Sequence, residues 1–116
     1  MNIRISVAAF ALCIISAPAF AHAHLKVSNP AADSSVASAP KELTLTFTEQ
    51  LEPALSGVAV TNDKGQVVEA KPAVVSGDTM TVTVKKLPAG LYHVAWHAVA
   101  VDTHRTEGKY DFTIKP

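Results

Sequence analysis

The sequence lacks several features that crosslink, anchor or charge a protein. Its 116 residues contain a single cysteine, Cys13, so no intramolecular disulfide is expected. The apolar run from Ile5 to Ile15 is well short of the roughly 20 residues that a transmembrane helix needs. Ten Lys and Arg balance ten Asp and Glu, and Lys85-Lys86 is the only adjacent basic pair. A disulfide-stapled domain, a membrane-inserted chain and a nucleic-acid-binding surface are therefore not predicted.

The first 21 residues have the pattern of a secretory signal peptide. Arg4 precedes the apolar run, and Ala19-Phe20-Ala21 supplies a small-x-small cleavage site. Lipoprotein processing at Cys13 is disfavoured because Leu12, rather than a small residue, precedes that cysteine. We therefore expect a signal peptide over residues 1–21 and one periplasmic domain over residues 22–116. Cleavage removes Cys13 and Arg4, which leaves nine basic against ten acidic residues, a net charge of about −1.

The remaining chain alternates apolar and polar residues with a period of two, which predicts β-strands. The expected strands are Leu25–Ser28, Glu42–Thr48, Gly57–Thr61, Gln66–Glu69, Thr79–Val84, Leu91–Val101 and Lys109–Ile114. Asn62-Asp63-Lys64-Gly65 suits a short hairpin loop, with Gly65 at positive φ. Ala31–Ala39 contains three serines and one aspartate, is flanked by Pro30 and Pro40, and is expected to be a loop. About seven strands in so short a chain predict an all-β, immunoglobulin-like fold, either a Greek-key β-barrel or a β-sandwich.

Cleavage after Ala21 would make His22-Ala23-His24 the new N-terminus. A free N-terminal histidine offers its α-amine and its imidazole Nδ1 to the same metal ion. The α-amine has a pKa of about 7.7–8.0 and so loses its proton at modest cost. His24 adds a second imidazole. A nitrogen-rich ligand set favours Cu(II), which forms the tightest complexes among the first-row divalent ions. A more ordinary interpretation, that these histidines merely follow a cleavage site, stays open.

A second group of candidate ligands, Asp102-Thr103-His104, follows the longest predicted strand. In an extended segment residues i and i+2 project to the same side, so Asp102 and His104 are expected to present a carboxylate and an imidazole to one point. The alternative is a solvated loop aspartate with an incidental histidine. His93 and His97 are expected to lie on the outer face of their strand, opposite Trp96, and to be surface residues rather than ligands.

These motifs resemble the CopC family of periplasmic copper-binding proteins, and the resemblance covers essentially the whole mature chain. The matching segments are His22–Lys26, Asn29–Ala32, Leu45–Glu49, Tyr92–Trp96, Val99–His104 and Gly108–Ile114. The resemblance implies a Greek-key β-barrel and a Cu(II) site built from His22, Asp102 and His104, with His24 as a possible further ligand. Some members of the family also bind Cu(I) through a methionine-rich loop. Here only Met80 would survive processing, so a Cu(I) site is not expected.

Two other function classes compete with copper carriage. Copper-dependent polysaccharide oxygenases also hold copper at an N-terminal histidine, but they are generally larger and present an aromatic-rich face, whereas this chain has 6% aromatic residues. An immunoglobulin-like interaction module is the other rival. The family resemblance favours a monomeric copper-binding protein, not an enzyme, that sequesters or carries copper and cooperates with an inner-membrane copper transporter.

Overall fold

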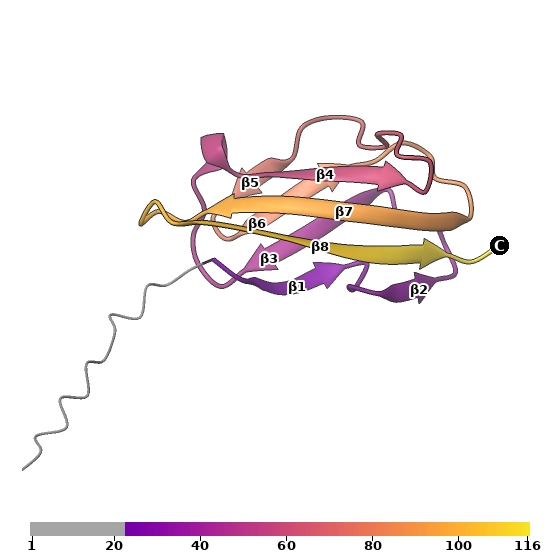
Figure 1. The fold of residues 1–116 in the computed structure, drawn as a ribbon, viewed down its shortest axis with the longest axis horizontal. Helices are drawn as coiled ribbons and strands as arrows, with labels where there is room; N and C mark the ends of the chain where they lie inside the picture. Colours follow the sequence, from indigo (N-terminus) through magenta and orange to yellow (C-terminus); the bar gives the residue numbers. More distant parts are fainter. Residues whose placement is uncertain (1–22) are drawn as a thin grey trace, which may run out of the picture.

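The computed structural model describes residues 23–116, which form two four-stranded β-sheets packed face to face (Figure 1). One sheet has the strand order β1-β3-β6-β5 and the other β2-β8-β7-β4. The strands are β1 (Leu25–Asn29), β2 (Ser34–Val36), β3 (Glu42–Phe47), β4 (Gly57–Asn62), β5 (Val74–Ser76), β6 (Thr79–Thr83), β7 (Gly90–Val99) and β8 (Arg105–Ile114), and a 3₁₀ turn, η1, spans Pro53–Leu55. The predicted all-β class is confirmed. Of the two architectures considered from the sequence, a Greek-key β-barrel and a β-sandwich, the structure is a β-sandwich.

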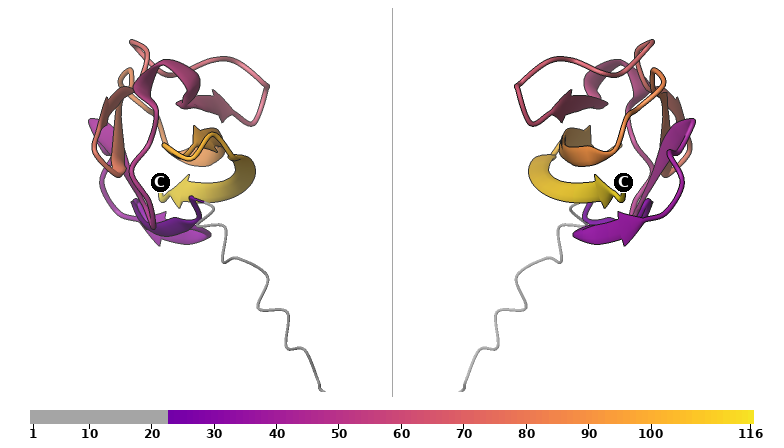
Figure 2. Two further views of the ribbon diagram at one scale, coloured as in Figure 1. Left: turned by 90° about the vertical axis from the view of Figure 1, so that its left-hand side faces the viewer. Right: turned by 90° about the vertical axis from the view of Figure 1, so that its right-hand side faces the viewer.

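Figure 2 shows the two sheets end-on, facing each other. The buried apolar side chains of both sheets form the core. Alternate residues of β3 face inward, so that Leu43, Leu45 and Phe47 are buried while the threonines between them are more exposed. Tyr92 of β7 stacks on Phe112 of β8 with ring centroids 5.3 Å apart. Each fully buried apolar side chain contributes about 1.5–3 kcal/mol to folding, which stabilises the domain without a disulfide.

Several of the strands predicted from the sequence differ from those in the structure. Residues 66–69 form no strand, because Thr61–Val67 and Glu69–Val84 are isolated bridges. The expected loop Ala31–Ala39 contains β2, which pairs in parallel with β8, and β5 was not anticipated. Strand β8 begins at Arg105 rather than Lys109, because residues 105–108 pair with the end of β7 in one long hairpin. The turn at Asn62 was predicted correctly, and Gly65 has φ +76°.

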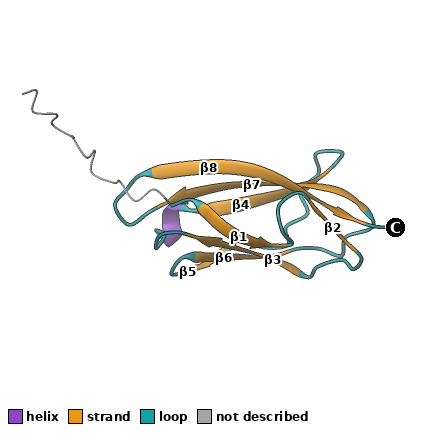
Figure 3. Ribbon diagram, turned by 90° about the horizontal axis from the view of Figure 1, so that it is seen from below, coloured by secondary structure: helices purple, strands orange, loops and turns teal. Residues whose placement is uncertain are grey.

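One end of the sandwich gathers three segments that are distant in sequence. The β7–β8 hairpin, η1 and the beginning of β1 all lie there, as Figures 1 and 3 show from two directions. The backbone N–H of Val101 donates to the carbonyl of Gln50, and that of Glu52 donates to the carbonyl of Val99. These bonds hold the hairpin against the chain that follows β3. No helix within residues 23–116 has the length and apolar character needed to span a membrane.

Candidate metal centre

The β7–β8 hairpin brings Asp102 and His104 together at its tip. The Nδ1 atom of His104 lies 3.5 Å from Oδ2 of Asp102, and the His104 backbone N–H donates to Oδ1 of the same carboxylate over 3.1 Å. Both side chains are more than a third exposed. Two donors can bind one ion at bond lengths near 2.0–2.1 Å only when they lie within about 4 Å of each other. The pair therefore already has a separation compatible with a shared ion.

The way in which the chain forms this pair differs from the sequence prediction. Residues 100–104 make a tight turn and not an extended segment, since the N–H of Thr103 donates to the carbonyl of Ala100 and that of Ala100 to the carbonyl of His104. Thr103 has φ +76°, a conformation that is costly for a β-branched residue. The Asp102 carboxylate accepts the His104 amide proton, an aspartate contact that stabilises such turns. The pairing was predicted correctly, but its geometric basis was not.

The first described residue is fixed beside this hairpin. Ala23 is fully buried, and its carbonyl accepts a 2.6 Å hydrogen bond from Oγ1 of Thr106. Thr106 lies at the start of β8, two residues after His104, and both residues are half-buried. On the other side, the N–H of His24 donates to Oγ1 of Thr48, whose own N–H donates to the His24 carbonyl. Ala23 and His24, which precede β1, are thus bonded to Thr106 of β8 and to Thr48 at the end of β3, and Thr106 lies two residues after His104.

The structure describes three of the four predicted ligands. His22 lies outside residues 23–116, and its position is not described. Asp102 and His104 come together as predicted. His24 is exposed where β1 begins, and within the described residues no three His, Cys, Asp or Glu side chains are grouped so as to hold a metal ion. His24 therefore does not complete a three-ligand group with Asp102 and His104.

The other histidines and the methionine lie elsewhere. His97, on the outer face of β7, packs over Gly57, whose added Cβ would come within 2.8 Å of the imidazole. His93 contacts two carboxylates, those of Asp63 and Asp111. The hydrogen bond that the ring donates to Asp111, followed by the one to Asp63, raises the pKa of His93 above its ordinary value. Met80 is fully buried in the core between the sheets.

Trp96 supports the same end of the sandwich from inside. Its indole packs edge-on against Phe47, with ring centroids 5.0 Å apart, and covers Gly108 of β8. A Cβ on Gly108 would come within 2.5 Å of the indole, so only glycine fits under this ring. Along the β7–β8 ladder the Trp96–Gly108 pair lies four residues from His104, about 13 Å. The only tryptophan of the chain is therefore a useful reporter for the hairpin.

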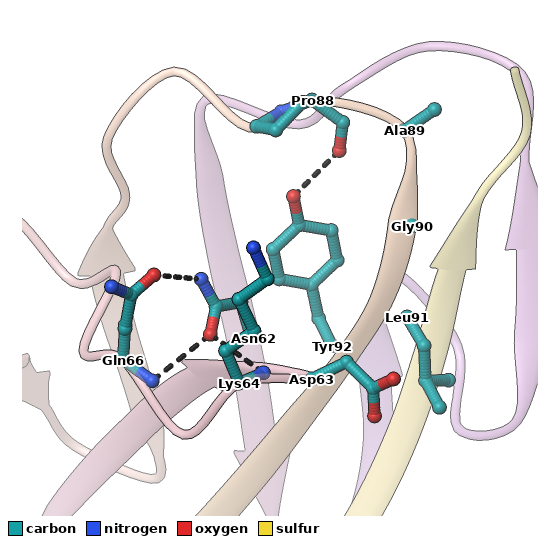
Figure 4. Close-up of a pocket in the computed structure, with 9 residues that line it drawn as sticks. All are labelled: Asn62, Asp63, Lys64, Gln66, Pro88, Ala89, Gly90, Leu91 and Tyr92. Atoms are coloured by element: carbon teal, nitrogen blue, oxygen red, sulfur yellow. Dashed lines mark hydrogen bonds between the residues drawn. The ribbon is translucent and has the colours of Figure 1, made fainter.

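A pocket of about 400 Å³ lies at the opposite end, where β7 begins (Figure 4). Asn62 closes the neighbouring turn by accepting backbone N–H bonds from Lys64 and Gln66, and Tyr92 donates its hydroxyl proton to the carbonyl of Pro88. Asp63 is the single potential metal ligand among the nine lining residues. This pocket is therefore not the predicted copper centre.

Comparison with known proteins agrees with the fold and with the resemblance. The family model described as "CopC domain" matches residues 25–115. The chain belongs to the CopC family. It is 33% identical over 118 residues to Protein YobA of Escherichia coli K12, covering 98% of this chain and 95% of that protein. It is also 37% identical to Copper resistance protein C of Xanthomonas campestris pv. juglandis, covering 98% of this chain and 96% of the relative.

Solved structures of CopC proteins have the same fold. The crystal structure of CopC from Methylosinus trichosporium OB3b superposes with a TM-score of 0.76 at 32% identity, covering 82% of this chain and 95% of that one. PcoC, a copper resistance protein from Escherichia coli, gives a TM-score of 0.69 at 41% identity, covering 79% and 99%. Proteins of the CopC family are copper-binding carrier proteins and not enzymes, and membership places the chain in that class.

Proposed function

We propose that the processed protein binds Cu(II) in the periplasm at a site that joins its N-terminus to the β7–β8 hairpin. The α-amine and imidazole of His22 and the side chains of Asp102 and His104 are the proposed ligands. The observation that supports this most directly is that the residue after His22 is hydrogen-bonded to Thr106, two residues after a His104 side chain that lies 3.5 Å from Asp102. His24 has a secondary role in this proposal.

The ligand chemistry suits Cu(II) more than Cu(I). Imidazole nitrogen, amine nitrogen and carboxylate oxygen suit Cu(II), whereas Cu(I) prefers soft thioether and thiolate sulfur. After cleavage at residue 21 the chain would keep no cysteine and only Met80, which the core buries completely. A PcoC relative from Escherichia coli is described as methionine-rich. This chain offers no comparable sulfur surface in residues 23–116.

One relative supports a proposed role in carrying copper to a transport protein. A segment of Copper transport protein CutJ of Bacillus subtilis is 33% identical to 89% of this chain, although the match spans only 20% of CutJ. A domain of this family is therefore part of a much larger protein named for copper transport. We propose that the present protein, as a separate monomer, sequesters copper or passes it to a membrane copper transporter. In both roles it contributes to copper resistance.

The decisive test is whether the α-amine must be free. Cu(II) is titrated into protein that begins at His22 and into protein that carries one extra residue before it, both at about pH 7. The extension blocks an amine ligand, so we expect affinity to fall at least on the order of a hundredfold, about 2.7 kcal/mol. Equal affinities in the two forms would remove the amine from the site and contradict the proposed ligand set.

A further inference from the structure

Away from the hairpin, His93 on the outer face of β7 lies between carboxylates from two other segments. Its Nδ1 is 2.7 Å from Oδ1 of Asp111 on β8, and its Nε2 is 3.3 Å from Oδ1 of Asp63 in the loop after β4. The His93, Asp63 and Asp111 side chains are 41%, 72% and 47% exposed. His93 is six residues before the end of β7, about 20 Å from the hairpin. This cluster is thus separate from the Asp102–His104 pair.

The two contacts of the His93 ring are unequal, and the difference matters for metal binding. The short contact with Asp111 suits an Nδ1–H group that donates its proton to that carboxylate. In the neutral tautomer with this proton on Nδ1, the Nε2 lone pair is available to a metal ion on the side of Asp63. Metal-binding histidines usually have such a carboxylate on the nitrogen that does not bind the metal. The 3.3 Å from Nε2 to Oδ1 of Asp63 is also within about 0.4 Å of the roughly 2.9 Å that separates two adjacent ligand atoms on a tetragonal ion with bonds of 2.0–2.1 Å.

We propose that His93 and Asp63 form a second, weaker site for a divalent transition-metal ion, with Asp111 as a positioning residue. Nε2 of His93 and Oδ1 of Asp63 are the protein ligands, and water completes the coordination. An adjoining pocket of about 290 Å³, lined by His93, Asp111 and Lys109, leaves room for that water. Cu(II) binds such nitrogen and oxygen ligands most tightly among first-row divalent ions and is therefore the preferred occupant.

Two features make this site weaker than the proposed N-terminal one. Only two protein ligands converge on it, in keeping with the absence of any metal-binding group of three or more His, Cys, Asp or Glu side chains across residues 23–116. The ammonium group of Lys109 on β8 lines the same pocket and opposes a bound cation. When His93 is protonated, a metal ion must displace the Nε2 proton that the ring donates to Asp63, so each ion bound to protonated His93 releases one proton. Affinity should therefore be higher at pH 8 than at pH 6.

The experiment is a Cu(II) titration of protein beginning at His22, followed by calorimetry and electron paramagnetic resonance up to two equivalents. The wild type should bind a second equivalent more weakly than the first. His93→Gln and Asp63→Ala should each weaken the second equivalent at least tenfold and leave the first unchanged. His97→Gln is the matched control, because it removes a histidine from the same strand and the same outer face, and it should change neither equivalent.

Asp111→Asn separates positioning from folding, because it retains both metal ligands. We expect the affinity for the second equivalent to fall about tenfold, as for other groups that orient a ligand, with the first equivalent unchanged and the domain still folded. The proposal is overturned if the wild type binds no second equivalent, or if His93→Gln or Asp63→Ala retains it. Loss of the first equivalent alone would contradict the proposed function and not this second site.

Discussion

Replacing Thr106 with valine tests whether the fold positions the N-terminus for copper. The Thr106 hydroxyl has one proton, and the 2.6 Å contact to the Ala23 carbonyl is much shorter than its 3.5 Å contact to the carbonyl of Ala98. Valine keeps the shape of the side chain but removes the donor, and Ala23 is fully buried. Leaving a buried carbonyl without this donor costs about 1–3 kcal/mol, which should appear as a lower urea midpoint.

The same change should weaken copper binding, because His22 directly precedes the anchored residue. If about 1–2 kcal/mol of the positioning is lost, the Cu(II) dissociation constant rises roughly 5- to 30-fold. The assay is a Cu(II) titration of protein beginning at His22, followed by Trp96 fluorescence. Thr113→Val is the matched control, since it removes a threonine hydroxyl from the same strand. Its urea midpoint and its Cu(II) dissociation constant should both stay near the wild-type values. A Thr106→Val protein that is less stable but binds Cu(II) within twofold of wild type would refute the reasoning.

Two further predictions concern stability. Gly108→Ala places a methyl group 2.5 Å from the Trp96 indole, so we expect a loss of about 1–3 kcal/mol in urea unfolding; an unchanged midpoint would show that the ring moves freely. The raised pKa of His93 means that its contacts with Asp111 and Asp63 stabilise the fold fully below the unfolded value near 6.5 and lose that effect as pH rises through the folded pKa. His93→Gln should therefore reduce the gain in stability that wild type shows at pH 6 relative to pH 9, and an identical pH dependence in both proteins would contradict this assignment.

How far the sequence predicts the fold depends on the length of each pattern. Alternation over Leu43–Phe47 and Tyr92–Val94 identified strands correctly, because one face of each is buried. The short strands Ser34–Val36 and Val74–Ser76 carry no periodicity of their own and exist because β8 and β6 offer them pairing partners. Residues 66–69 show the opposite error. Their sequence pattern predicts a strand, but in the structure they form only isolated β-bridges.

The contact between Asp102 and His104 was predicted from the sequence, but the residues that support it were not. The spacing of Asp102 and His104 correctly indicated a pair, although a turn at Thr103 forms it. The hydrogen bond from Thr106 to Ala23 joins residues 83 positions apart, and no local pattern signals it. The contact of His93 with two carboxylates is also non-local. Sequence reasoning placed that histidine on the surface correctly but had no means of identifying its partners.

The central claim is that copper joins the N-terminus to the hairpin rather than binding to the N-terminal segment alone. A purely local Cu(II) complex would use the amine, two deprotonated amides and the His24 imidazole, and it would form equally on the unfolded chain. A site that exists only in the folded state instead stabilises it by RT ln(1 + [L]/Kd), which is about 2.7 kcal/mol at 100 Kd of free metal.

The most direct measurement is thermal unfolding at about pH 7, with and without one equivalent of Cu(II), on wild type, His24→Ala and His104→Ala, each beginning at His22. A midpoint shift of several degrees is the scale expected for a domain of this size. The account predicts that the copper-induced rise survives in His24→Ala and vanishes in His104→Ala. A rise that persists in His104→Ala but is lost in His24→Ala would show that the N-terminal segment holds the metal without the hairpin.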